Sequence, residues 1–213
     1  MVEIGYFNMD DKTKPSSSTY SSARDRIMSA ALQLFYTKGY PNTGINEILE
    51  TAGSFKKTLY IHFPSKRDLG KSYLSLQEAS ILSLVERIMK RERIYSKFIK
   101  SWIRVVKRGI KTYYQFGCPI ANFANQTHED DEFRNLTTDF IHRWQKLFEN
   151  YLSEIRTRNR NKATREQIRD VAETILLYYQ GAMQLYGMSG DVKYLNKLEK
   201  QLLKLKDELG SFA

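Results

Sequence analysis

The chain has 213 residues, 41% of them hydrophobic and 27% charged, and a formal net charge of +10. This composition is ordinary for a globular protein of one large or two small domains, and the charge favours a polyanionic partner, either nucleic acid or an acidic membrane surface. The single cysteine, Cys118, excludes an intramolecular disulfide and suits a reducing cytoplasm, and no apolar run approaches the roughly 20 residues that span a bilayer.

Residues 1–21 are expected to form a flexible leader. They include "KPSSSTYSS" and lack the basic start and apolar core of a secretory signal. Either Met1 or Met9 fits as the translation start.

Residues 22–38 have the pattern of an amphipathic helix, and further helical patterns follow along the chain. Apolar residues recur there at the spacing of one buried face, and Ser21 or Ser22 can cap the start. A short second helix follows, with Thr43 as its candidate N-cap. The third segment, residues 55–63, comes after a glycine turn. Together these three elements have the layout of a helix-turn-helix.

The third segment has two different faces. At 100° per residue, Phe55, Leu59 and Phe63 fall on one side and form an expected buried stripe. The outer face is cationic and aromatic, with Lys57, Tyr60 and Ile61, and with Lys56 at its margin. A pair of lysines on a helix is usually a solvated surface. In a helix-turn-helix, however, lysine can neutralise phosphate and reach guanine in the major groove, so we favour DNA binding.

The sequence "RDRIMSAALQLFYTKGYPNTGINEILETAGSFKKTLYIHFPSKRDL", residues 24–69, resembles the N-terminal DNA-binding domain of TetR-family transcriptional repressors. The motifs are "AA-x-x-LF-x-x-x-GY", "I-x-x-A-G" and "K-x-TLY-x-HFPSK-x-x-L". The resemblance implies DNA contacts by Lys56, Lys57, Thr58, Tyr60, His62 and Lys66, to which we add Thr43. On spacing alone, His62 is more typical of the edge of a core.

Two departures from the family pattern fall in this stretch. Ser54 and Phe55 stand where the family usually has an aliphatic residue and then Ser or Pro. Lys57 stands where glycine is common, which adds a charge near the DNA.

The second half of the chain is also expected to be helical. Patterns cover a long helix to about Lys90 and residues 98–116, 133–155 and 167–186, with a final helix after the turn at 187–191. The segment "GCPIANFANQ", which begins at Gly117, resembles one TetR-like subgroup. That resemblance implies a helical C-terminal domain that binds a small effector and dimerises through its last two helices.

A leucine repeat in the final helix suggests how the chain associates. The a/d spacing of a coiled-coil seam is typical of either a dimer interface or a helix pair inside one subunit, and we favour the dimer. The predicted interface residues are Ile175, Tyr179, Leu195, Leu198, Leu202 and Leu205.

Aromatic residues and one methionine are candidates for the effector site. They are Trp102, Tyr113, Phe116, Phe123, Trp144, Tyr178 and Met183. Aromatic residues at helical spacing more often form plain core than a ligand site.

Positive charge is concentrated in residues 86–111, which hold ten basic and two acidic side chains. We interpret this stretch as a solvated face. The alternatives are an anionic effector, such as an acyl-CoA, or extra DNA contacts.

An enzyme is the competing class. The sequence spacing of the three histidines and Cys118 does not indicate a catalytic nucleophile–base pair, and the sequence has no glycine-rich phosphate loop. "HEDDEF" at 128–133 lacks the two-histidine spacing of a zinc helix and fits the acidic start of a helix. We therefore expect no metal, no cofactor and no catalysis.

The sequence thus predicts a cytoplasmic, all-α homodimer that does not enter a membrane. Residues 22–69 would form the DNA-binding domain and residues 70–213 a helical domain for effector binding and dimerisation. The resemblance implies a repressor that a small-molecule effector releases from a palindromic double-stranded operator. The alternative is an architectural DNA-binding protein that no effector controls.

Overall fold

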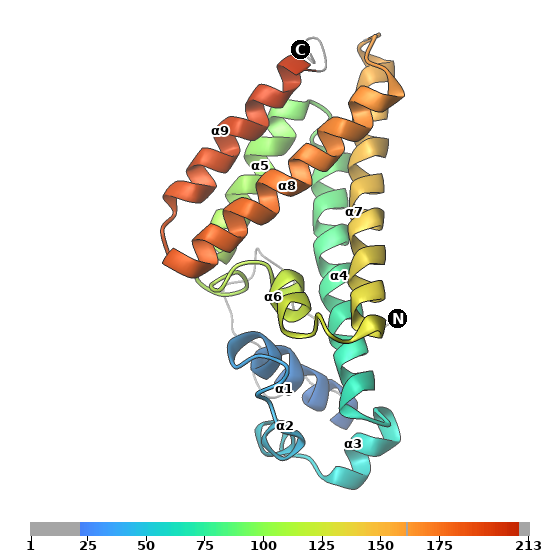
Figure 1. Ribbon diagram of the computed structural model, residues 1–213, viewed down its shortest axis with the longest axis vertical. Coiled ribbons are helices and arrows are strands. Elements are labelled where there is room, and N and C mark those ends of the chain that lie inside the picture. Colours follow the sequence, from blue (N-terminus) through green and yellow to red (C-terminus); the bar gives the residue numbers. More distant parts are fainter. Residues whose placement is uncertain (1–21, 161, 209–213) are drawn as a thin grey trace. The chain divides into compact units, whose positions relative to one another are not determined.

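The computed structural model describes residues 22–160 and 162–208, with the side chains of 207 and 208 left aside, and within them every regular element is an α-helix (Figure 1). The predicted leader lies outside the described residues. The helices are α1 (Ala23–Thr37), α2 (Ile45–Ala52), α3 (Lys56–His62), α4 (Lys66–Arg91), α5 (Tyr95–Gly109), α6 (Pro119–Gln126), α7 (Asp131–Arg158), α8 (Arg165–Ser189) and α9 (Lys193–Glu208). The predicted all-α class is confirmed.

The helices form two compact units. Unit 1 extends to Ser80 and includes Asn122–Thr137, and unit 2 comprises Ile81–Ala121 and the chain from Thr138 onward. Unit 1 is therefore larger than the predicted 22–69 segment, because it also contains part of α4 and the segment from α6 into α7.

Helix ends in unit 1 follow local side-chain chemistry. Ser22 caps α1 by accepting a hydrogen bond from the backbone N–H of Asp25, at 3.2 Å, and Ser65 does the same for Asp68 at the start of α4, at 3.1 Å. Asp130 accepts from the backbone N–H of Glu132 at the start of α7, at 3.1 Å. The acidic cluster around residue 130 thus begins a helix.

An aromatic cluster holds unit 1 together. Its rings belong to Phe35, Tyr40, Tyr73, Phe123 and Phe133, and the centroids of contacting rings are 4.9–6.4 Å apart. The backbone N–H of Tyr40 also donates to Oε1 of Gln126 at 2.9 Å. These contacts pack α6 and the start of α7 against α1 and α4 within the unit.

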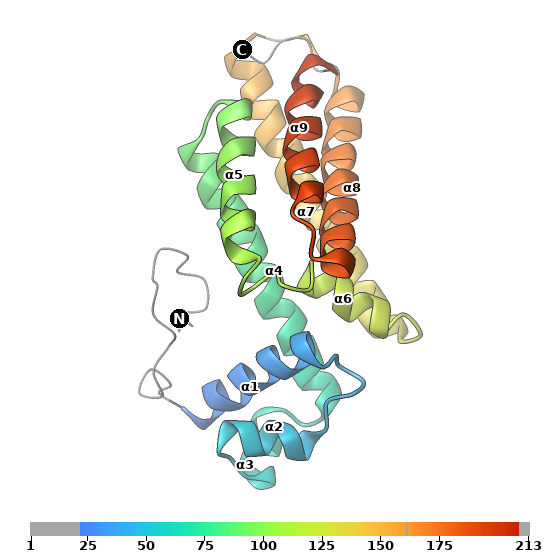
Figure 2. The same ribbon diagram turned by 90° about the vertical axis from the view of Figure 1, so that its left-hand side faces the viewer.

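Unit 2 is a bundle in which α9 packs between α5 and α8 (Figure 2). The hydroxyl of Tyr95 on α5 donates to the backbone carbonyl of Leu202 on α9, at 2.8 Å. A second aromatic cluster fills the interior, where the Trp102 ring stacks on Tyr179 with centroids 4.9 Å apart.

Two helix predictions need correction. The helix expected over residues 98–116 begins at Tyr95 and ends at Gly109, because buried Tyr95 already belongs to its apolar face and turns follow Gly109. α6 was not expected, since Gly117 breaks the chain, but Pro119 suits the first turn of a new helix.

Candidate nucleic-acid interface

The turn between α2 and α3 is fixed by backbone hydrogen bonds. Gly53 has φ 55°, a left-handed conformation that favours glycine, and it closes α2. The next N–H, that of Ser54, donates to the carbonyl of Leu49 at 3.0 Å. This is the geometry that redirects the chain into α3.

Two buried side chains anchor α3 inside unit 1. Leu59 and Phe63 are almost completely buried, and the guanidinium of Arg24 on α1 lies 5.2 Å from the centroid of the Phe63 ring. The backbone of α3 is therefore held in place by its inner face, as predicted, and its outer face is left in solvent.

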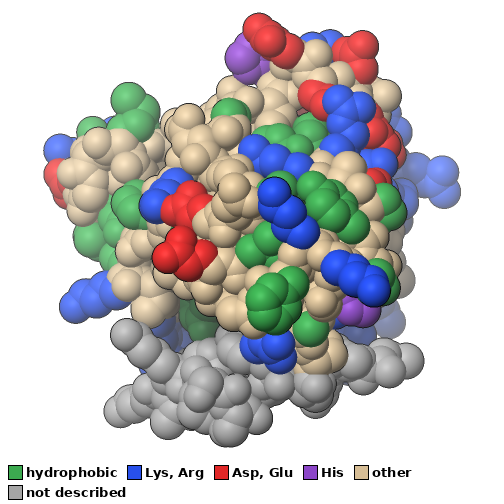
Figure 3. Space-filling model, turned by 90° about the horizontal axis from the view of Figure 1, so that it is seen from below, with side chains coloured by type: hydrophobic (Ala, Val, Ile, Leu, Met, Phe, Trp, Pro, Cys, Tyr) green, Lys and Arg blue, Asp and Glu red, His purple; other side chains and the backbone are tan. Residues whose placement is uncertain are grey.

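The outer face of α3 carries cationic and apolar side chains together. Lys56, Lys57, Tyr60, Ile61 and His62 are all exposed. Figure 3, which shows the molecule from below, presents Lys and Arg side chains interleaved with hydrophobic ones on this face. Within the described residues, no ion pair neutralises either lysine of α3. This face can therefore contact both phosphates and the apolar edges of bases.

The placement of Phe55 corrects its predicted role. Phe55 is 79% exposed, although the 100° pattern placed it on the buried stripe. It is the N-cap residue of α3, with an extended backbone (φ −118°, ψ 154°), so helical periodicity does not apply to it. Its ring is exposed at the start of α3, next in sequence to Lys56.

Thr43 is not available to DNA in the way predicted. It is buried, and its hydroxyl lies 2.8 Å from the carbonyl of Gly39 and 3.3 Å from that of Leu34. The N-cap of α2 is Gly44 instead. The Thr43 side chain holds the turn between α1 and α2, because a buried hydroxyl needs partners.

The other predicted contacts have different surroundings. His62 is exposed, so the interpretation as an edge-of-core residue is wrong, and Thr58 is half-buried. The ammonium of Lys66 lies 3.4 Å from the carbonyl of Pro41 and 4.6 Å from the centroid of the Tyr40 ring. Burial lowers the pKa of Lys66 from its usual value. Lys66 is thus tied to the turn that precedes α2.

The candidate effector residues do not all come together. Phe123 belongs to the aromatic cluster of unit 1, and Tyr113, Phe116 and Tyr178 are exposed. Trp102, Trp144 and Met183 are buried in unit 2. Sequence periodicity could not separate these groups, because it shows which helix face is apolar and not which unit that face joins.

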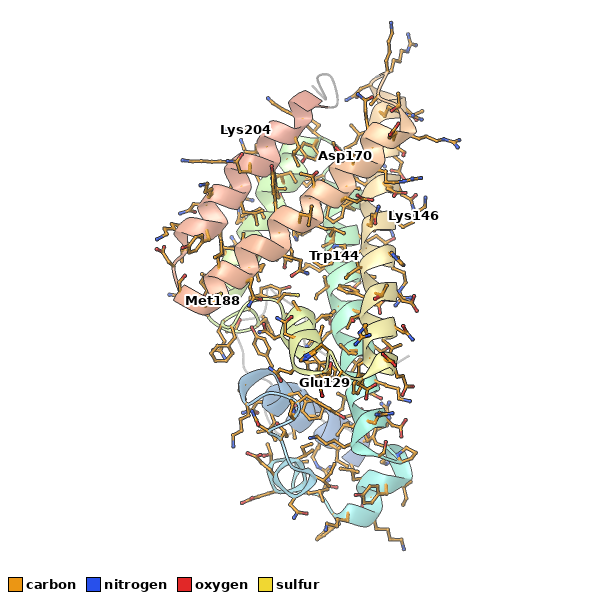
Figure 4. All side chains as sticks on the ribbon, viewed as in Figure 1. Glu129, Trp144, Lys146, Asp170, Met188 and Lys204 are labelled. Carbon is orange, nitrogen blue, oxygen red and sulfur yellow. The ribbon has the colours of Figure 1, made fainter. Side chains whose placement is uncertain are left out.

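One buried polar atom stands out in unit 2. The indole Nε1 of Trp144, on α7 (Figure 4), has no hydrogen-bond partner among the described residues. The ring lies against other aromatic rings, with centroids 5.1 Å from Phe140 and 5.1 Å from Tyr179. A buried N–H without an acceptor is costly, and it offers a donor to a bound molecule.

The predicted dimer residues need correction. All six are buried within one protomer: Ile175, Tyr179, Leu195, Leu198, Leu202 and Leu205. Their spacing serves the packing of α8 and α9 in the bundle, which is the alternative reading of the leucine pattern. The exposed apolar residues of α8 are different ones, namely Leu177, Tyr178, Leu185 and Met188. Leu177, Leu185 and Met188 share one helix face, but Gly181 stands between them, so the leucine repeat of α9 was the more regular signal.

Among the described residues, no cluster of three or more His, Cys, Asp or Glu side chains could hold a metal ion. None of the described helices is long and apolar enough to cross a membrane. Burial raises the pKa of the Cys118 thiol, as expected for a structural cysteine.

Family comparisons match both halves of the chain. Residues 27–72 match the model of the bacterial regulatory proteins of the tetR family. Residues 95–201 match the LmrA/YxaF-like C-terminal domain of transcriptional regulators.

Known proteins agree with these matches. The transcriptional regulator LmrA of Bacillus subtilis is 41% identical over 59 residues, which cover 28% of this chain and 29% of that protein. An uncharacterised helix-turn-helix regulator of Lactococcus lactis is 26% identical over 190 residues, covering 87% and 92%. The crystal structure of a TetR-family regulator from Streptomyces coelicolor has the same fold, with a TM-score of 0.77 and 18% sequence identity, over 89% of this chain and 96% of that one.

Proposed function

The chain belongs to the TetR family of transcriptional regulators, and we propose that it is a repressor that a small-molecule effector releases from a palindromic operator. The observation that carries this proposal is the outer face of α3. Buried Leu59 and Phe63 fix the helix, while Lys56, Lys57 and Tyr60 remain exposed, and neither lysine forms an ion pair among the described residues.

In the proposed complex, α3 enters the major groove. Lys56 and Lys57 lie at the N-terminal end of α3, where the free backbone N–H groups of a helix also favour phosphate. Tyr60 and Thr58 can fix the register by hydrogen bonds to the backbone. A dimer would place two such helices in successive major grooves, about 34 Å apart.

We propose that dimerisation uses the exposed apolar face of α8. Leu177, Gly181, Leu185 and Met188 follow one another at intervals of four, four and three residues on that helix, Tyr178 lies beside this row, and Leu177 and Met188 are more than two-thirds exposed. Gly181 lies in the same row, and a Cβ there would meet nothing within 4 Å. A row of this kind fits the self-complementary contact of a two-fold dimer.

The effector is expected to bind in the interior of unit 2. The unpartnered Nε1 of Trp144 supports this location, because a ligand with a hydrogen-bond acceptor would satisfy it. Trp102 and Met183 are buried in the same unit. By linkage, an effector that weakens DNA binding must itself bind less tightly to the DNA complex, by the same factor.

Selection from a pool of random duplex DNA at physiological salt tests the proposal. An enriched palindrome would support a dimeric, sequence-specific regulator and supply the probe for an effector screen. Binding without enrichment would contradict sequence-specific control and favour the architectural alternative, because non-specific affinity arises from phosphate neutralisation alone. A chain with Lys56 and Lys57 both replaced by alanine is the control, and it should lose enrichment.

A further inference from the structure

The outer face of α5 carries a row of exposed cations. Lys97, Lys100, Arg104 and Arg108 follow one another at intervals of three or four residues along α5, whose opposite face is buried, and exposed Lys111 comes three residues later, just after the helix ends. None of these five forms an ion pair within the part of the chain that the structure describes. Like charges one turn apart weaken a helix, so the row is a source of repulsion.

Part of this row lines a groove. Lys100, Arg104, Lys107 and Arg108 form its wall on α5, Glu199 of α9 contributes the facing side chain, and its volume is about 330 Å³. The Nζ of Lys107 lies 2.6 Å from Oε2 of Glu199. That pair neutralises itself across the groove, and the other three cations stay uncompensated.

The groove is built on a fixed scaffold. Its two walls belong to unit 2 and pack against each other through the buried leucines of α9, and Tyr95 donates to the carbonyl of Leu202 between the same helices. Figure 2 shows α5 and α9 side by side. The backbone that carries the cations is therefore held in place by the packing of α5 against α9.

The chemistry of the lining points to clustered anionic oxygens. Arg104 and Arg108 lie one turn apart on α5, and each planar guanidinium can donate two parallel hydrogen bonds to phosphate or carboxylate. Lys100 adds a third positive charge on the preceding turn. We propose that this groove binds a small polyanion with adjacent phosphate groups.

The size of the groove favours a small ligand over a nucleic-acid strand, because its lining is confined to about two turns of α5 and one residue of α9. Lys97 and Lys111 lie outside the lining, so they serve as a control for charge that does not belong to the groove. The groove shares no residue with the aromatic interior where the effector is proposed to bind. Binding to the groove can therefore be measured without an operator.

Titration calorimetry of the full chain with tripolyphosphate, at physiological salt, tests the proposal. We expect saturable binding to one site per protomer. Arg104→Gln with Arg108→Gln should weaken it about tenfold or more, because two charge-assisted contacts are lost. Glu199→Gln should tighten it severalfold, since it frees Lys107 and removes the only acidic side chain of the described lining.

The matched control is Lys97→Gln with Lys111→Gln, which removes the same charge from the same side of the chain but outside the groove. This control should keep its affinity within about threefold, because distant exposed charges are screened. Equal losses in the two double variants, or no saturable binding by the wild type, would overturn the proposal. Tighter binding of citrate than of tripolyphosphate would assign the groove to polycarboxylates instead.

A competition experiment tests whether the groove binds nucleic acid instead. A non-specific DNA duplex should not displace tripolyphosphate from a chain whose Lys56 and Lys57 are both alanine. Displacement in that chain would assign the groove to nucleic acid and refute the small-ligand site. Circular dichroism and thermal unfolding of each variant should match the wild type, because the substituted side chains are exposed or half-exposed.

Discussion

The ammonium of Lys66 lies over the ring of Tyr40, 4.6 Å from its centroid, and 3.4 Å from the carbonyl of Pro41. Lys66 therefore has partners within unit 1, whereas Lys57 on α3 extends into solvent without an ion pair among the described residues. The two lysines should differ in what they contribute to DNA binding.

Lys57→Ala should weaken binding to all DNA sequences and reduce the slope of log K against log salt by about one, because one phosphate contact is lost. Lys66→Ala should change that slope by less, since its charge is already engaged by the turn. Fluorescence anisotropy across a salt series measures both.

The control for this comparison is Lys146→Ala. Lys146 lies on α7 in unit 2 and pairs with Glu149 at 3.1 Å (Figure 4). Its loss should leave the slope unchanged. A slope change for Lys66→Ala as large as that for Lys57→Ala would show that Lys66 leaves Tyr40 to contact phosphate.

Phe55 should contribute to operator specificity. Its ring is 79% exposed at the start of α3, where an apolar side chain can contact the methyl group of thymine. Phe55→Ala should remove a thymine preference at one position of each half-site, where the preference is expected to be worth about 1–3 kcal/mol, the usual cost of one mismatched base pair. Sequencing of the bound DNA pool measures this, and an unchanged preference at every position would contradict it.

The helix-turn-helix could be predicted because each of its elements carries a local signal. Ser22 caps α1, Gly53 takes a left-handed conformation, and Ser65 caps α4, all through contacts within a few residues. Phe55 and Thr43 were misplaced for a related reason. A residue just outside a helix does not follow helical periodicity, so its exposure depends on the geometry of the turn.

The interface residues could not be predicted from the leucine pattern. Leu198 and Leu202 have the spacing of a seam, and that spacing is the same whether the partner helix belongs to the same chain or to a second one. The structure gives their partners as α5 and α8. The groove beside α5 was equally invisible, because its facing residue, Glu199, is 92 positions from Lys107.

Gly70 should be required by the aromatic cluster of unit 1. A Cβ at this position would lie 2.9 Å from the Tyr40 ring and 3.0 Å from the Phe133 ring, closer than packed atoms allow. Gly70→Ala should lower the free energy of unfolding by about 1–3 kcal/mol, as overpacking does. Chemical denaturation measures the change.

Gly44→Ala is the comparison for that variant. Gly44 has φ −84°, and a Cβ there would meet nothing within 4 Å. The cost should stay below about 1 kcal/mol, which is the usual range for an N-cap exchange. Equal costs at the two glycines would mean that the Tyr40 and Phe133 rings yield without strain.

The exposed face of α8 should decide the oligomeric state. Leu177→Glu with Leu185→Glu places two charges on the proposed dimer surface, where burying them without partners is costly, so monomers should form. Leu198→Ala removes a buried contact of the bundle instead. It should destabilise the protein by about 2–5 kcal/mol and leave the dimer intact. Sedimentation velocity and chemical denaturation separate the two effects. If the variant with both charges on α8 is still a dimer, the interface must lie on another face. If Leu198→Ala is fully folded but monomeric, the interface must include the leucine repeat of α9.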